Sequence, residues 1–293
     1  MTLTTVASMN GLWLSQVFED AVFAARARTL MASPTLVTSF SDRTGDEDRT
    51  LPEYVRATAA EVAGTADYTA AQEFTKGTAS NLSIKEAIAQ FEISDRRFES
   101  DPDDVRADAG RELGAALAQK IDSDLTTEFG DFTGGGGTIG NGAGTITWGA
   151  FFAARSRLAN GGTTGNGIPG PYVAVLHEFH WFELAKSASV AGAQTNASAA
   201  LLDAVNQRYY VATVSDVDIF VTNNIAISGT AAVSGMYNRS ALALDMRRPP
   251  RLEPDRDASA RKTELNLTVK YAAGEWRPDH GIPLHYLAAL PTG

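Results

Sequence analysis

The residues best suited to chemistry are His177 and His180, within the stretch His-Glu-Phe-His. A zinc hydrolase motif places two histidines four residues apart with a glutamate between them, so that both imidazoles reach one metal ion. Here the histidines are three residues apart, and Glu183, His280 and His285 follow at no motif spacing. We therefore expect two ordinary histidines at a strand–helix junction, and we assign no metal, no cofactor and no catalytic residue.

Two other patterns formally match ligand sites. Gly135–Gly140 reads Gly-Gly-Gly-Thr-Ile-Gly, like the dinucleotide fingerprint, but that motif needs a strand before it and a helix after it. Here a helix precedes and more glycine follows, so we expect a flexible loop. Asp101, Asp103, Asp104 and Asp108 cluster at the start of a helical pattern, where helix-dipole complementarity explains them better than metal binding.

Charge and composition narrow the function classes. The 293 residues carry a net charge of −10, which does not suit a general nucleic-acid binder, because phosphate contacts need Lys and Arg. There is no Cys, so disulfides and Cys-based zinc sites are excluded, as suits a reducing cytoplasm. We find neither an apolar run long enough for a membrane span nor a signal-peptide pattern after Met1, and expect no membrane partner.

The segment Arg247–Lys262 is the most basic part of the chain and contains three prolines. It reads as an exposed loop. Two interpretations remain open, a solvated loop and a loop that contacts nucleic acid or a neighbouring subunit.

The longest predicted element is a helix between Asp101 and Gly130. Apolar residues recur at a step of four, close to the helical period, at Val105, Ala109, Leu113, Leu117, Ile121, Leu125 and Phe129. Asp101 and Pro102 suit the first positions, and Gly130 is a natural stop. The helix would have about 28 residues and span ~42 Å, far beyond the usual length of about 11–12 residues.

The segments before this helix look poorly supported as parts of a monomer. Residues 10–31 predict an amphipathic helix, and 35–43 a strand. Two extended runs, 49–62 and 81–97, are joined by small and polar residues at 63–80. We expect a long two-stranded excursion, which is marginal in water without a partner surface.

The segments after the helix predict a compact mixed α/β domain. Its helices are expected at 148–159, capped by Thr147 and ended by Asn160-Gly161, and at 178–188, with a shorter helix or turn at 201–207. Its strands are expected at 172–176, 209–214 and 217–222, and return strands follow at 232–246 and 263–273. The aromatics Trp148, Phe151, Phe152, Phe179, Trp181 and Phe182 have helical spacing and are expected in the core.

This order of parts resembles the major capsid protein of tailed phages, the Hong Kong 97-type fold. Local similarities add weight, including Phe91-Glu92-Ile93-Ser94-Asp95 before the long helix and Arg277-Pro278-Asp279 near the end. The resemblance implies an α+β fold, with an N-terminal arm at 1–34 and an extended β-hairpin loop at 44–93. It further implies a peripheral domain with a long spine helix at 94–130 and 242–273, and an axial α/β domain at 131–241 and 274–293.

The same resemblance implies the function. The protein would be a non-enzymatic major capsid protein that forms hexamers and pentamers of an icosahedral shell around a phage dsDNA genome. Its partners would be itself, a separate scaffolding protein, a portal, decoration proteins, and packaged dsDNA by non-specific contact. We expect it in the virion, after assembly in the host cytoplasm.

The resemblance leaves two points and two other functions open. Some members of the family carry an N-terminal scaffolding segment, but here the arm begins soon after Met1, so we expect scaffolding to be a separate protein. Some members also cross-link a lysine of the extended loop to an asparagine of a neighbour. Lys76 and Lys85 lie in that loop, but spacing identifies no asparagine partner, so we expect non-covalent assembly. The alternatives are an encapsulin-type compartment shell and a soluble metal-dependent hydrolase that uses His177 and His180.

Overall fold

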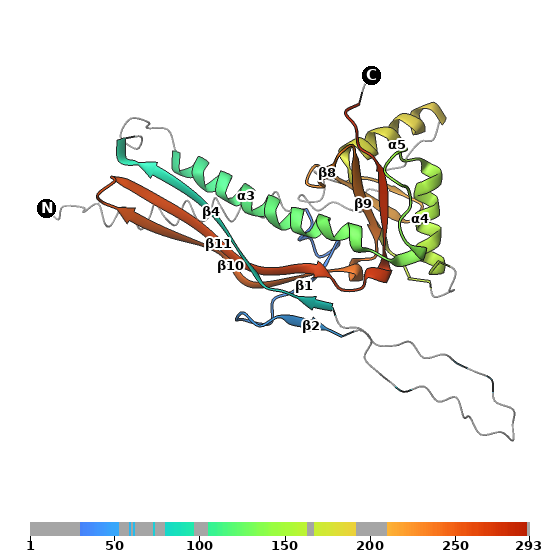
Figure 1. Ribbon diagram of the computed structural model, residues 1–293, viewed down its shortest axis with the longest axis horizontal. Helices are drawn as coiled ribbons and strands as arrows, with labels where there is room; N and C mark the ends of the chain where they lie inside the picture. The colour runs from blue at the N-terminus through green and yellow to red at the C-terminus, as the bar shows by residue number, and fades with distance from the viewer. Residues whose placement is uncertain are drawn as a thin grey trace.

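The computed structural model describes residues 30–52, 59, 61, 73, 80–96, 105–162, 167–191 and 210–291. The described chain is elongated, with a long helix and a long-stranded sheet joined at one end to a second sheet (Figure 1). The predicted arm helix, the connecting segment of the hairpin, the aspartates at 101–104 and the segment 201–207 lie outside the described residues, apart from single positions.

The long helix is α3, Val105–Thr127. Its stripe is buried as predicted, with Leu113, Leu117, Ile121 and Leu125 all at most 5% exposed. The helix ends earlier than predicted, because Glu128–Asp131 tightens into a 3-10 turn that places the fully buried ring of Phe129 against Tyr237.

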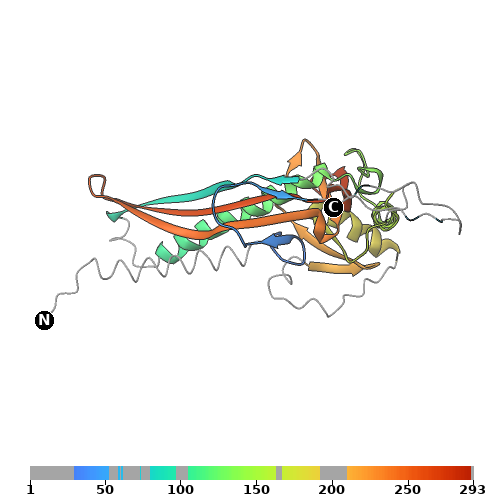
Figure 2. The same cartoon turned by 90° about the horizontal axis from the view of Figure 1, so that it is seen from below.

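A four-stranded sheet runs alongside α3 (Figures 1 and 2), in the order β1 (Thr38–Phe40), β10 (Leu242–Asp257), β11 (Lys262–Glu275) and β4 (Lys85–Ser94). The long pair β10–β11 is antiparallel, and the whole of β4 pairs with residues Lys262 to Tyr271 of β11. Val269, Leu267 and Leu265 of β11 are fully buried in the same cluster as the α3 stripe.

The prediction of an exposed loop at Arg247–Lys262 was wrong, because β10 continues to Asp257 and turns directly into β11. The prolines had suggested a break. The pairing shifts register between Met246 and Arg251, where Pro249 and Pro250 lie. Strand β1 covers β10 only at Ala243–Asp245, so the prolines occupy a bulged edge where a missing N–H costs little.

The predicted two-stranded excursion is also only partly correct. In the described residues, β2 (Arg49–Leu51) pairs with β3 (Ser80–Leu82), each three residues long. Strand β4 joins the large sheet instead, because its alternate residues Ala87, Ala89 and Ile93 pack on the α3 core. The strand predicted at 35–43 is shorter, Thr38–Phe40.

The second sheet has the order β12-β9-β5-β7-β6, and β8 pairs with β9. Its strands are β5 (Tyr172–His177), β6 (Tyr210–Val214), β7 (Val217–Thr222), β8 (Ile227–Ser228), β9 (Ala231–Tyr237) and β12 (Gly281–Leu287). Helices α4 (Trp148–Asn160) and α5 (Glu178–Ala191) complete this part. The predicted caps of α4 are confirmed, since Thr147 Oγ1 accepts from Ala150 N and Gly161 is left-handed with φ 65°.

The first glycine-rich segment is not the flexible loop that we expected. Ile139 N donates to Pro283 O at 2.9 Å, and His285 N donates to Ile139 O at 2.9 Å, so the chain lies along β12 like an added strand. A Cβ on Gly134 would lie 2.2 Å from Asp279 O, and one on Gly140 would lie 2.2 Å from His285 O. These glycines therefore serve close backbone approach rather than mobility.

The predicted aromatic core is partly correct. Phe151 is fully buried, while Phe152 and Phe182 are 42% and 36% exposed. None of the helices in the described residues is long and apolar enough to span a membrane.

Candidate assembly surfaces and their anchors

The two histidines lie at the predicted strand–helix junction, where β5 passes into α5. His180 is fully buried, with Nε2 3.2 Å from Tyr286 O and Nδ1 2.8 Å from Ser234 Oγ. Because a carbonyl oxygen only accepts, Nε2 carries the proton, and Ser234 donates to Nδ1 while accepting from His177 N at 3.0 Å. Burial lowers the pKa of His180 to about 4, so the ring is neutral near pH 7.

The hydrogen bonds of His180 connect a helix to two strands of the second sheet. Both ring nitrogens of His180 are occupied by partners from β9 and β12, which joins α5 to the β12 side of the sheet. Across the described residues, no group of three or more His, Cys, Asp or Glu side chains could hold a metal ion.

A buried carboxylate connects the end of the N-terminal segment to the spine helix α3. Asp122 is 1% exposed and accepts from the backbone N–H groups of Leu30 and Met31, both at 2.9 Å. Asn224, which follows β7, donates from Nδ2 at 3.3 Å. One side chain therefore joins three parts of the chain. Burial raises the pKa of Asp122 to about 6, although these hydrogen bonds oppose the rise.

A second buried charge cluster fixes the root of the β2–β3 hairpin. Asp245 on β10 is fully buried and pairs with Arg49 Nε of β2 at 2.7 Å and with Arg247 Nε at 2.9 Å. Arg49 also bonds Asp42, and Arg247 donates from Nη2 to Glu47 O at 2.9 Å. These bonds set the direction in which the hairpin leaves the sheet, since buried Arg–Asp pairs have specific geometry.

The basic residues of 247–262 are mostly neutralised within the chain. Lys262 Nζ lies 2.8 Å from carboxylate oxygens of both Glu92 and Glu264, and Arg256 pairs with Asp95. Arg248 pairs with Glu86. The pairs connect β10 and β11 to β4 and the residue after it, which leaves little free basic charge for phosphate.

Exposed apolar side chains lie on β4, the outer strand of the four-stranded sheet. Ile88 is 63% exposed and Phe91 42%. A groove of about 540 Å³ lies between β4 and α3, lined by Lys85, Glu86, Ala87, Ile88, Ala89, Ala116, Leu117, Lys120, Asp124 and Tyr271. In the described part of the chain, the outer edge of β4 has no strand partner. An unpaired edge strand that exposes large apolar side chains is typical of an interaction surface.

Comparison with known proteins identifies the family of this chain. Residues 78–278 match the family model of phage capsid proteins. The chain belongs to the phage capsid protein family. Among curated proteins, no match was found. The sequence prediction of a tailed-phage major capsid protein is thus confirmed, and the protein is structural rather than enzymatic.

Solved capsid structures share the fold. The capsid structure of the cyanophage P-SCSP1u is 14% identical, with a TM-score of 0.64 and 89% of each chain covered. A structure from Mycobacterium phage Che8 is 17% identical, with a TM-score of 0.62, covering 87% of this chain and 90% of that one. A virus-like particle from Pyrococcus furiosus is 12% identical, with a TM-score of 0.55, covering 92% and 98%. This capsid protein therefore has the predicted Hong Kong 97-type α+β fold.

Sequence reasoning missed the anchors of this capsid protein. The sequence could have marked Asp122 as a buried carboxylate, because it lies on the same helix face as Ala118 and Leu125, which are fully buried. A charged residue within a buried face implies a specific partner. Nothing in the sequence pattern marked Asp245, whose partner Arg49 comes from a strand distant in sequence.

Proposed function

We propose that this capsid protein forms hexamers and pentamers that close into an icosahedral shell around a phage dsDNA genome. The match to the phage capsid family over residues 78–278 carries the proposal. The geometry adds support, because the apolar edge of β4 and the groove beside it gain burial only when another copy covers them.

The four-part division of the chain belongs to this proposal. The arm is 1–34, the extended loop 44–93, the peripheral domain 94–130 with 242–273, and the axial domain 131–241 with 274–293. The boundary between the extended loop and the peripheral domain lies before β4 rather than after it in this proposal, because β4 (Lys85–Ser94) pairs with β11. The extended loop then ends at the β2–β3 root.

The remaining partners are proposed on the same basis. They are a separate scaffolding protein, a portal, decoration proteins and packaged dsDNA, which the acidic chain would contact non-specifically. Assembly would take place in the host cytoplasm and yield the virion capsid, without a covalent cross-link.

The test is light scattering and negative-stain electron microscopy of the purified protein, with and without a co-expressed scaffolding protein. We expect closed particles or capsomer-sized oligomers. A stable species of 31.1 kDa under every condition, including high concentration, would contradict the proposal.

A second candidate is a compartment shell of the encapsulin type. It is favoured by the likeness to the virus-like particle from Pyrococcus furiosus, which covers 98% of that chain. Purified particles separate the two functions, since the phage capsid would contain DNA and the compartment an enzyme.

A further inference from the structure

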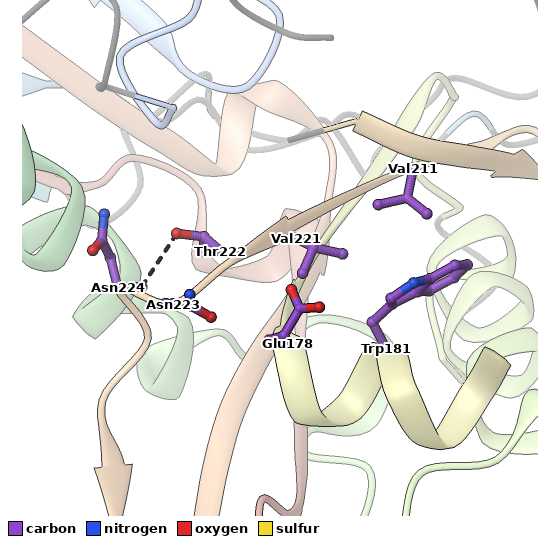
Figure 3. A pocket seen from close by; sticks show the side chains of 7 residues that line it. All are labelled: Glu178, Trp181, Val211, Val221, Thr222, Asn223 and Asn224. Carbon is purple, nitrogen blue, oxygen red and sulfur yellow. Dashed lines mark hydrogen bonds between the residues drawn. The ribbon is translucent and has the colours of Figure 1, made fainter. Parts of the chain in front are cut away.

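A pocket of about 520 Å³ opens at the carboxyl ends of β5 and β7 (Figure 3). It is lined by Glu178, Trp181, Val211, Val221, Thr222, Asn223 and Asn224. It is separate from the β4 groove, whose lining residues are different. The carboxyl ends of neighbouring parallel strands are a frequent place for ligand sites in mixed sheets.

The strand register brings the polar groups of this pocket together. Strands β5 and β7 are parallel, with His177 opposite Thr222 as their last residues. Glu178 and Asn223 therefore leave the sheet side by side. Trp181 comes three residues after Glu178 on α5, which places both side chains on one helix face. Figure 3 shows the indole beside the Glu178 carboxylate, with Val211 across from it.

The lining has the chemistry of a cation site. It contains one carboxylate, one large aromatic face, amide groups and two valines, and none of the lining residues is basic. Glu178 is exposed and has no ion-pair partner among the described residues. An indole face attracts Lys and Arg side chains, most strongly where water is partly excluded.

The electrostatics favour a cation over an anion. The N-terminus of α5 contributes only about half a positive charge, which the full negative charge of Glu178 exceeds. Behind the pocket, Asn224 donates from Nδ2 to Asp122 Oδ2 at 3.3 Å, so a second carboxylate adds to the negative potential. A metal ion fits poorly, because a single lining carboxylate supplies too few oxygen ligands.

We propose that this pocket binds a guanidinium or ammonium group carried on an apolar stem, as in an arginine or lysine side chain. The charge lies at Glu178, with Asn223 as an amide partner. The stem lies against Trp181 and Val211.

The test is a titration of the unassembled full chain with N-acetyl-arginine methylamide, followed by calorimetry or NMR. We expect saturable binding that weakens at least tenfold in Glu178→Gln and in Trp181→Leu. Glu183→Gln is the matched control on the same helix and should bind as the wild type does. Circular dichroism verifies that each variant is folded.

A neutral probe of the same size, N-acetyl-norleucine methylamide, separates charge recognition from simple apolar binding. The proposal is overturned if binding does not saturate, if Glu178→Gln binds equally well, or if the neutral probe binds as tightly as the cationic one.

A second titration with assembled shells identifies the source of the cation. A pocket that is open in the unassembled chain and blocked in the shell receives its cation from a neighbouring copy. A pocket that binds the probe equally in both states is available to a separate protein. The titration of the unassembled chain does not depend on shell formation, so its failure is distinguishable from failure of the proposed function.

Discussion

At the scale of single residues, the described core depends on a few polar side chains that the hydrophobic pattern did not reveal. Asp122, Asp245 and His180 are all at most 1% exposed, and each connects elements distant in sequence. Unpaired groups of this kind would cost several kcal/mol, whereas paired ones fix how the elements meet.

Asp122 predicts a specific pH dependence. Its pKa in the folded protein, about 6, lies above the ordinary value of 3.8, so the folded state binds the proton more tightly. The stability that this group contributes is therefore present in acid and lost as the pH rises through 6. The full change is roughly 2–3 kcal/mol between pH 4 and pH 7.

The measurement is the free energy of unfolding of wild type and Asp122→Asn across this pH range. The free energy of unfolding of the variant should not change with pH through this group. It should also be about 1–3 kcal/mol lower than that of the wild type at every pH, because the N–H group of either Leu30 or Met31 then faces an amide donor. Identical pH profiles of the two proteins would refute the assignment.

His180 predicts a pH dependence of stability with the opposite sign to that of Asp122. Its pKa of about 4 lies below the ordinary 6.5, so the unfolded chain binds the proton more tightly and stability falls as the pH drops from 6.5 towards 4. His180→Gln should flatten that acid-side loss. It should also lower stability by about 1–3 kcal/mol at pH 7, because Ser234 and Tyr286 lose well-placed partners.

Thermal melting at several pH values checks this, with His285→Gln on strand β12 as the control histidine. An unchanged acid profile in His180→Gln would show that other groups cause the acid loss.

At the scale of elements, α3 was largely predictable because its stripe is long and strictly periodic. The caps of α4 and the buried strand β5 followed from Thr147, Gly161 and an apolar run. The errors arose where sequence allows two readings. Glycines between 134 and 140 allow flexibility or close packing, and only the position of β12 decides. Pro249 and Pro250 usually end a strand, but a bulged edge accepts them.

The buried stripe of α3 is tested by Leu117→Asp. Leu117 is 2% exposed within the main core, so an unpaired carboxylate there costs several kcal/mol and should prevent folding. Gln119→Asp, at an exposed position of the same helix, should fold normally. Soluble expression and circular dichroism distinguish the two, and a folded Leu117→Asp protein would mean that the stripe does not face a core.

Strand β4 is tested by Ile88→Asp. Because Ile88 is 63% exposed, the subunit should keep its fold and melting temperature within a few degrees. Assembly should weaken by more than about tenfold, since an interface that buries Ile88 loses about 2 kcal/mol and gains a desolvated charge. Ile88→Val should assemble normally. Wild-type assembly of Ile88→Asp, measured by light scattering, would show that no neighbour covers this face.

At the scale of the whole molecule, the described residues combine well-packed parts with exposed surfaces on β4 that contact with another copy would bury. Sequence order alone identified the fold, because a poorly supported excursion, a very long helix and a compact α/β domain rarely occur together. It did not locate the anchors, since Leu30, the β2–β3 root and the segment after β7 meet α3 and β10 only through tertiary contacts.

The central claim is that copies of this chain build a closed shell through the four-stranded sheet and the groove between β4 and α3. The most direct measurement is a cryo-electron microscopy reconstruction of particles from the purified protein. We predict an icosahedral shell of pentamers and hexamers in which Ile88 and the groove between β4 and α3 are covered by a neighbouring subunit. Particles without closed symmetry, or a shell that leaves Ile88 and the groove open to solvent, would contradict the account.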